Sequence, residues 1–214
     1  MDGLVSYTPC KQFIAPQKIM SICRSTPTAK NRSLLHSYNR PPGYRHVPRN
    51  INRELLDQGS LTHRLGEICS SGDIRVRLLQ EIRCETDPRV HRNLGLSKWN
   101  LVFKREVFLC CSLQPWVFAV TCIPISAING PAKRLCSLGT TPLGEVLFHN
   151  KRARRGPIEI HSRDLNIKNV SYGQCWGRQS IFTFHGAPVM VSEYFLPILT
   201  KYLLQPNYKS ISSE

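Results

Sequence analysis

The sequence predicts an α+β domain with a mainly antiparallel sheet of about six strands and helices packed on one side. Apolar runs rich in Val, Phe, Ile and Cys follow one another with only tight turns between them, as adjacent antiparallel strands do. Residues 101–111 and 116–123, separated by the turn at residues 112–115, are one such pair. Segments with helical periodicity are short, so the predicted strands outnumber long helices.

Short helices are predicted from their capping signals. One covers residues 51–56, and a second begins after Ser60. A kinked helix is expected over residues 126–135. Thr141-Pro142 then opens a short helix over residues 143–148, because proline is tolerated in the first turn.

Further strands are predicted from alternation and turn residues. Residues 74–82 alternate apolar and basic side chains, which is typical of a half-buried strand. Residues 180–184 and 188–196 are β-rich runs on either side of Gly186, which indicates a hairpin. Residues 161–174, by contrast, have the composition of a variable surface loop.

Composition also predicts the domain boundaries. Residues 1–40 show no sustained period and are interrupted by prolines, so we expect a basic, poorly ordered N-terminal extension there. The folded domain is expected over residues 41–204, and a polar tail over residues 205–214. Residues 1–50 hold eight basic residues against one acid, so an organelle transit segment is the alternative to a loosely docked extension.

Two isolated charges lie on apolar strand faces. Arg105 is the charged residue on the apolar face of residues 101–111, and Glu193 is the charged residue on that of Val189–Phe195. A buried charge without a partner is costly, so each needs a counter-charge or a ligand. The pair has two interpretations: a buried Arg–Glu bridge, or two walls of one internal cavity that binds an anion.

The chain is strongly basic, with 29 Lys and Arg against 14 Asp and Glu and a net charge of +15. Such a protein attracts anions, either nucleic acids or small carboxylates. No RNP, zinc-finger or KH pattern is present, and the aromatic residues are not interleaved with the basic ones as in a stacking groove. We therefore expect a small anionic ligand and no nucleic-acid partner.

The nine cysteines are an odd number and include no C-x-x-C pair. Most of them lie in apolar runs, where a reduced cysteine acts as a small hydrophobic residue. We expect reduced thiols, as in a reducing compartment, and no disulfide framework. Cys110 and Cys111 are adjacent, so at most one of them is expected to face the core.

No metal site or cofactor is predicted. The seven histidines show neither H-x-x-H nor HExxH spacing, and no Gly-rich phosphate loop or dinucleotide fingerprint is present. The chain contains no apolar segment long enough to cross a membrane and no secretory signal near its start. We expect a cytoplasmic monomer without a membrane span.

Many spaced motifs resemble, in the same order, those of the chorismate lyase (chorismate pyruvate-lyase) family. The similarity covers roughly residues 40 to 200, which makes it far more specific than a single pattern. The motifs are Gly59-Ser60-Leu61-Thr62, Arg105-Glu106, Pro115-Trp116, Ile123-Pro124-Ile125-Ser126, Gly130-Pro131, Leu138-Gly139-Thr140-Thr141-Pro142-Leu143-Gly144, Leu147-Phe148, Arg154-Arg155-Gly156-Pro157-Ile158-Glu159, Trp176-Gly177-Arg178 and Glu193-Tyr194-Phe195-Leu196-Pro197.

The resemblance implies the chorismate-lyase-like fold and the conversion of chorismate into 4-hydroxybenzoate and pyruvate, the first of which is the ring precursor of ubiquinone. It implies no cofactor. Arg105 matches the family arginine that binds the ring carboxylate, and Glu193 matches the glutamate near the 4-hydroxyl end of the product. Leu143 matches a residue that contacts the ligand through its backbone, and Leu61 matches a residue that closes the site.

One position departs from the family pattern. Val120 stands where the family usually has an arginine. If that arginine receives the second carboxylate of the substrate, another cation has to replace it here, and Arg178 is the nearest candidate by sequence. Arg155 is a weaker one, because residues 151–155 hold four basic residues in five, which favours a solvated loop.

Two other classes of function are weighed against the enzyme. A non-catalytic sensor of small aromatic acids with the same fold normally follows a winged-helix domain, and residues 1–50 are too short and proline-broken to form one. A basic nucleic-acid-binding module would bind with a strong salt dependence. The near-complete series of lyase motifs favours the enzyme.

Overall fold

The computed structural model of the protein describes residues 47–97, 100–206 and 208. By its contacts the chain divides into two units, residues 1–34 and 35–214, and every described residue belongs to the second. The expected extension over residues 1–40 therefore lies outside the described residues, as does the expected tail apart from residues 205, 206 and 208.

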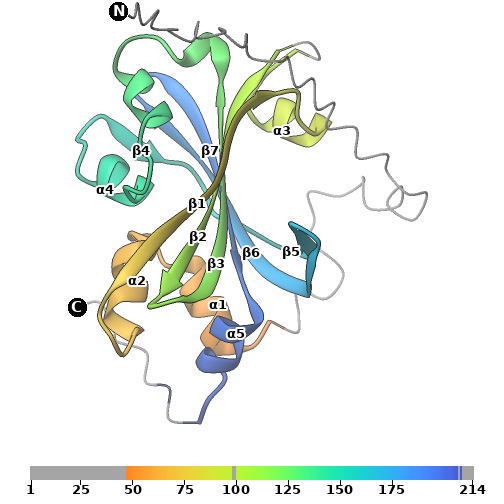
Figure 1. Ribbon diagram of the computed structural model, residues 1–214. Coiled ribbons are helices and arrows are strands. Elements are labelled where there is room, and N and C mark those ends of the chain that lie inside the picture. Colours follow the sequence, from red (N-terminus) through yellow and green to blue (C-terminus); the bar gives the residue numbers. More distant parts are fainter. Residues whose placement is uncertain (1–46, 98–99, 207, 209–214) are drawn as a thin grey trace, which may run out of the picture. The chain divides into compact units, whose positions relative to one another are not determined.

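Seven strands form one antiparallel sheet, whereas the sequence predicts about six. The fold class is α+β, as the sequence predicts. The strand order is β1-β2-β3-β7-β6-β4, and β5 pairs with β6 outside that path (Figure 1). The strands are β1 (Ile74–Cys84), β2 (Val102–Cys111), β3 (Gln114–Pro124), β4 (Ala153–Arg155), β5 (Glu159–Ile167), β6 (Val170–Phe184) and β7 (Ala187–Phe195).

The helices are short. They are α1 (Arg49–Leu56), α2 (Leu61–Ile68), α3 (Pro88–Asn93), α4 (Leu143–Phe148) and α5 (Pro197–Leu203). Of these, α1, α2 and α4 begin close to where the capping signals place them, whereas α3 and α5 were not predicted. The expected kinked helix is instead two 3-10 segments, η3 (Ile125–Ala127) and η4 (Gly130–Cys136). Gly130, the first residue of η4, has a left-handed φ of 60°, which breaks a continuous helix there. No helix of the described residues is long and apolar enough to span a bilayer.

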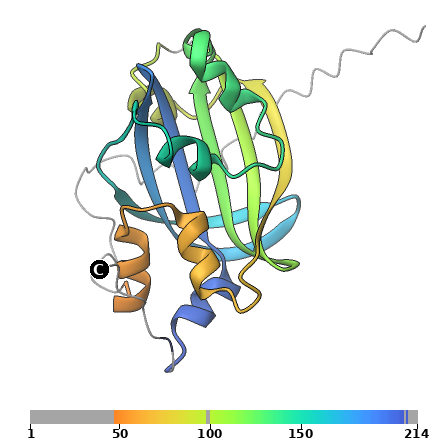
Figure 2. The same ribbon diagram turned by 90° about the vertical axis from the view of Figure 1, so that its left-hand side faces the viewer.

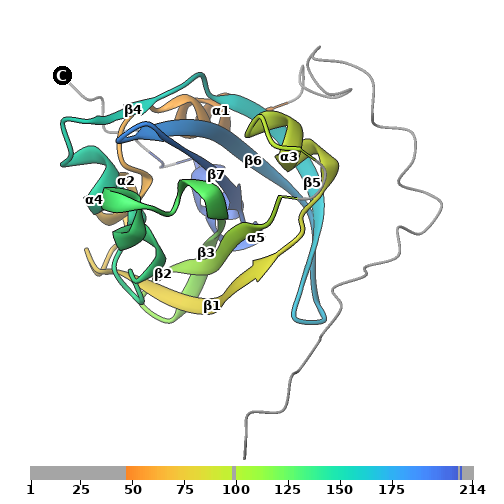
Figure 3. The same cartoon turned by 90° about the horizontal axis from the view of Figure 1, so that it is seen from above.

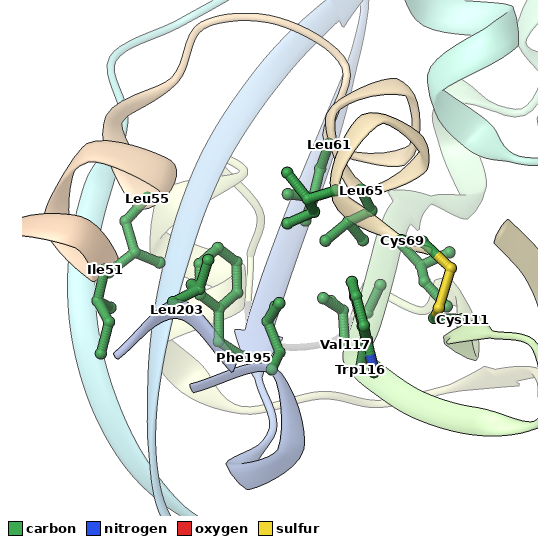
Figure 4. Packing of buried hydrophobic residues seen from close by; sticks show 14 of the residues in the cluster. Ile51, Leu55, Leu61, Leu65, Cys69, Cys111, Trp116, Val117, Phe195 and Leu203 are labelled. Carbon is green, nitrogen blue, oxygen red and sulfur yellow. A yellow bond between two sulfur atoms is a disulfide. The ribbon is translucent and has the colours of Figure 1, made fainter. Parts of the chain in front are cut away.

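One face of the sheet packs against most of the helices. Ile51 of α1, Leu65 of α2 and Leu203 of α5 pack against Val117 and Phe195 in one apolar cluster (Figure 4). A second cluster joins η4 and α4 to the other end of the same face. Seen from above, α2 and α4 lie on one side of the twisted sheet and α3 on the other (Figure 3).

The opposite face is covered as well, which corrects the prediction for residues 161–174. Those residues are not a variable loop but the far half of the long β5–β6 hairpin. Its Leu165 and Ile167 pack against Phe108 and Phe118. The hairpin turns at Lys168-Asn169, where both residues have positive φ (49° and 65°), as a two-residue primed turn requires. The strand is hard to see in the sequence because residues 161–164 are polar on both faces, so this half of the hairpin shows no alternation.

The absence of disulfides was a wrong prediction. Cys69, at the end of α2, is bonded to Cys111, at the end of β2, over 42 positions of sequence (Figure 4). Cys110 is free, and it too is buried, because it faces the opposite, equally covered side of the sheet. Both of the adjacent cysteines therefore face a core, each a different one.

The disulfide predicts a stability that depends on reductant. Opening a cross-link of this span is expected to lower the free energy of unfolding by about 2–4 kcal/mol, because the unfolded chain regains its freedom. Urea unfolding of the wild type with and without a thiol reductant measures the effect, and the double variant Cys69→Ser/Cys111→Ser should match the reduced protein. Cys136→Ser, at a free cysteine, is the control. Equal midpoints in both conditions would contradict the prediction.

Candidate active site

A cavity lies between the helix-covered face of the sheet and the segments that carry α2 and α4, which cross in front of the strands in Figure 2. Its empty volume is about 540 Å³, counting the part open to solvent. Its walls are mostly apolar and therefore suit a ring. The apolar strand residues are Val76, Val107, Leu109, Ala119, Phe182 and Val191.

Four charged side chains line this cavity: Arg105, Arg155, Arg178 and Glu193. Three guanidinium groups against one carboxylate leave a net charge of +2 in the cavity wall. Arg105 and Arg178 are among the most completely buried side chains of the described residues. Charges removed from water in this way need partners, and the arrangement of those partners determines which atoms a ligand can reach.

Arg105 is held along one edge of its guanidinium group. Its Nη2 donates hydrogen bonds to the carbonyl oxygens of Gly139 (2.8 Å) and Thr141 (3.1 Å), and its Nε lies 3.3 Å from Oε1 of Glu81. Burial lowers the pKa of Arg105, and the Glu81 carboxylate opposes that shift. Among the described residues Nη1 has no hydrogen-bond partner, so it is the nitrogen left for a ligand.

Arg178 and Glu193 form an ion pair inside the cavity. Nε of Arg178 donates to Oε2 of Glu193 at 2.6 Å, and Nη1 donates to the carbonyl oxygens of Glu54 (3.4 Å), Leu55 (3.5 Å) and Asp57 (2.7 Å). Arg178 is thus both a structural bridge and a cavity residue. Oε1 of Glu193 has no hydrogen-bond partner in the described part of the chain, so Glu193 keeps one oxygen for a ligand.

Arg155 also enters the cavity, although a solvated loop was the favoured interpretation of residues 151–155. Its Nε donates to Oγ of Ser180 at 3.0 Å, its Nη2 lies 3.9 Å from Oε2 of Glu193, and its guanidinium group lies over the ring of Phe182. Burial and the neighbouring Arg178 cation lower the pKa of Arg155 to about 10.

The composition of residues 151–155 does not show which of these basic residues faces the cavity. Arg154 and Arg155 are consecutive in β4, so they point to opposite sides: Arg154 is exposed, whereas Arg155 pairs in register with Phe182 and faces inward. Only the alternation of side chains along the three-residue strand β4 distinguishes Arg155 from Arg154. Such a strand is not recognisable in a run of basic residues.

The roof of the cavity is formed where the first turns of α2 and α4 meet. A Cβ atom on Gly144 would lie only 2.6 Å from Oγ of Ser60, so a larger residue there would force the Ser60 hydroxyl to rotate. Leu61 and Leu143 lie beside this contact and both line the cavity. Leu61 is also part of the core beneath α2, whereas Leu143 is half-buried.

A model of the chorismate lyase family matches residues 36–203, well over half of the chain. The chain belongs to the chorismate lyase family. The chorismate pyruvate-lyase of Enterobacter sp. (strain 638) is 34% identical over 143 residues, which cover 67% of this chain and 80% of the relative. That of Photorhabdus laumondii subsp. laumondii is 29% identical over 151 residues, which cover 71% of this chain and 83% of the relative.

A solved structure that resembles this member of the chorismate lyase family distantly is an effector domain. The effector domain of PhnF from Mycobacterium smegmatis aligns with a TM-score of 0.44 and 12% identity, over 66% of this chain and 93% of that one. A similarity this low bears on neither the fold nor the function.

The departure from the chorismate lyase pattern at Val120 does not remove a charge from the cavity wall. Val120 lies opposite Glu106 and Ser192 in the sheet, and its side chain packs against the clusters on the far face. Its neighbours Ala119 and Thr121 are the residues that line the cavity. Because side chains alternate along a strand, an arginine at position 120 would point away from the cavity.

The contact between α2 and α4 predicts opposite effects for two Gly→Ala substitutions. Gly144→Ala is expected to lower the free energy of unfolding by about 0.5–1 kcal/mol, because the Ser60 hydroxyl has to rotate away and give up its cap of α2. Gly66→Ala in α2, where a Cβ would make only an ordinary contact at 3.8 Å, should instead raise it by about 0.5–1 kcal/mol. Urea unfolding measures both values.

The double variant Gly144→Ala/Ser60→Gly tests the cause. It removes the clashing Oγ, and glycine remains an acceptable cap for α2, so most of the lost stability should return. A double variant that is no more stable than Gly144→Ala would show that Ser60 is not the obstacle.

Proposed function

We propose that the protein is a chorismate lyase, which eliminates pyruvate from chorismate and leaves 4-hydroxybenzoate. The proposal rests on one observation above all: the cavity wall carries a net charge of +2 around an apolar interior. Chorismate is a dianion with a carboxylate on its ring and another on its enolpyruvyl group. A site of that charge and character, in a chain of the chorismate lyase family, suits it.

The site residues have separate roles in this proposal. Nη1 of Arg105 receives the ring carboxylate, because the other edge of the guanidinium group already bonds to the protein. Arg155 and Arg178 lie about Glu193 and receive the enolpyruvyl carboxylate. The free Oε1 of Glu193 then faces the hydroxyl end of the ring, where it orients the substrate or moves a proton.

The reaction needs few catalytic groups from the protein. The bond between the ring carbon and the ether oxygen breaks, the carbon that bears the hydroxyl group loses its hydrogen, and the ring becomes aromatic. Enolpyruvate takes up a proton to become pyruvate. Since aromatisation provides the driving force, the protein has to hold the reactive conformer, neutralise two carboxylates and exclude water. The roof formed by α2 and α4, with Leu61 and Leu143 at its edge, serves the exclusion of water.

Several finer points belong to the same proposal. An elimination that is driven by aromatisation needs no cofactor, and family membership supports a role in supplying 4-hydroxybenzoate for ubiquinone. The cytoplasmic location, the monomeric state and the lack of a nucleic-acid partner stay predictions from the sequence.

Incubation of the purified protein with chorismate tests the proposal directly. Equimolar 4-hydroxybenzoate and pyruvate are expected by chromatography. Arg105→Ala should lower kcat/KM by about 10²–10³-fold, since a buried charge contact is lost. Glu193→Gln, which keeps an acceptor for Arg178, should lower kcat by about 10²-fold if Glu193 moves a proton.

Arg77→Ala is the matched control. Arg77 lies on the neighbouring strand β1, but its guanidinium group rests over the ring of Phe108 on the opposite face of the sheet. Its kinetic constants should equal those of the wild type. Saturable binding of 4-hydroxybenzoate without turnover would show that the protein is a binding domain and not an enzyme. The absence of both turnover and binding would reject the proposal.

A further inference from the structure

A β-bulge in the edge strand β1 determines which side chain faces Arg105. The pairing of β1 with β2 is regular from Ile74 to Leu78, shifts by one residue, and resumes with Gln80 opposite Glu106 and Glu81 opposite Arg105. Without that shift, regular pairing would place Gln80 opposite Arg105. The extra residue therefore turns a carboxylate rather than an amide toward the cavity arginine, as bulges beside active sites commonly re-aim side chains.

Glu81 and Arg105 form an ion pair whose two nearest atoms do not meet in good hydrogen-bond geometry. Oε1 of Glu81 lies 3.3 Å from Nε of Arg105, and both atoms are buried. They are the only buried side-chain nitrogen and oxygen atoms of the described residues that lack a hydrogen-bond partner. Buried polar groups are nearly always satisfied, so this pair is an exception whose arrangement needs a physical explanation.

Glu81 itself is not part of the cavity wall. Glu81 contacts the edge of the Arg105 guanidinium group that faces away from the cavity. Together with the carbonyl oxygens of Gly139 and Thr141, it occupies the edge formed by Nε and Nη2. A planar group held along one edge has a fixed plane, and its remaining nitrogen, Nη1, has a fixed direction.

We infer that Glu81 is a positioning residue for Arg105, which holds the guanidinium group so that Nη1 is directed at the carboxylate of the ligand. The inference rests on the proposed function, because it takes the ligand of Arg105 to be a ring carboxylate. It adds a residue from a different strand, outside the cavity wall, that acts only through Arg105.

Two physical effects of Glu81 have opposite signs, which makes the inference testable. As a nearby negative charge, Glu81 weakens the attraction of the cavity for any anion, so its removal would tighten binding. As a positioning residue it strengthens the contact with a carboxylate, so its removal weakens binding. Positioning is expected to dominate, because a long arginine side chain otherwise loses conformational freedom on binding the ligand.

The experiment compares 4-hydroxybenzoate with its neutral analogue 4-hydroxybenzamide by calorimetry. Glu81→Gln keeps the size of the side chain and removes its charge, whereas Glu81→Asp keeps the charge and draws it back by one methylene. Both variants are expected to raise the Kd of 4-hydroxybenzoate by about tenfold, the effect of one hydrogen bond to a charged group. The Kd of 4-hydroxybenzamide should change by less than about twofold, so the preference for the carboxylate falls.

Turnover of chorismate gives a second readout. KM is expected to rise in both Glu81 variants while kcat changes little, because the contact is made equally in the ground state and the transition state. A purely structural role for Glu81 would lower stability and active fraction without changing the preference for carboxylate over amide.

Glu106→Gln is the matched control. Glu106 is the next residue to Arg105 on β2, but it faces the other way and interacts with Lys104 and Gln80. It should bind both ligands as the wild type does. The inference is overturned if the Glu81 variants behave like this control, if Glu81→Gln binds 4-hydroxybenzoate more tightly, or if only Glu81→Asp keeps wild-type affinity.

Failure of the proposed function is a separate result. It would appear in the wild type, as the absence of both turnover and binding of 4-hydroxybenzoate, and it would remove the basis of the inference as well. Wild-type turnover combined with unaltered Glu81 variants would overturn the inference alone.

Discussion

Three guanidinium groups around one cavity, two of them fully buried, are the constraint that the rest of this structure has to satisfy. A cation taken out of water needs acceptors, and each arginine here obtains them from a carboxylate or a hydroxyl and from backbone carbonyl oxygens. Arg178 is the clearest case, with Glu193 on one side and the carbonyl oxygens at the end of α1 on the other. Carbonyl oxygens at the C-terminal end of a helix carry its negative end, so they are natural acceptors for a cation.

The same hydrogen bonds hold the roof in place. The carbonyl oxygens that accept from Arg155 belong to Asp57, Gln58 and Gly59, which lead into α2, and those that accept from Arg105 belong to Gly139 and Thr141, which lead into α4. Charge compensation in the cavity and the position of its cover are therefore not independent. A change at one arginine is expected to alter both the binding of an anion and the order of the segment above it.

The sequence was informative wherever a signal lay within one element. Arg105 and Glu193 could be identified because a single charge on an apolar strand face is conspicuous, and the hairpin at Gly186 could be identified from its turn. Contacts between different elements could not be predicted from the sequence in the same way. The pairing of Cys69 with Cys111 joins the ends of a helix and a strand, and the partnership of Glu81 with Arg105 depends on a one-residue shift in register that no pattern in β1 reveals. The direction of Arg155 depends on pairing with β6.

The bulge in β1 has a second consequence, at the outer side of the sheet. β1 is an edge strand of 11 residues, and a straight edge of that length offers a long row of unpaired backbone groups to another chain. The extra residue interrupts that row in its middle, and the exposed Arg75 and Arg77 add like charges along it. Strand-to-strand aggregation between copies of the chain is thus disfavoured by the same residue that turns Glu81 inward.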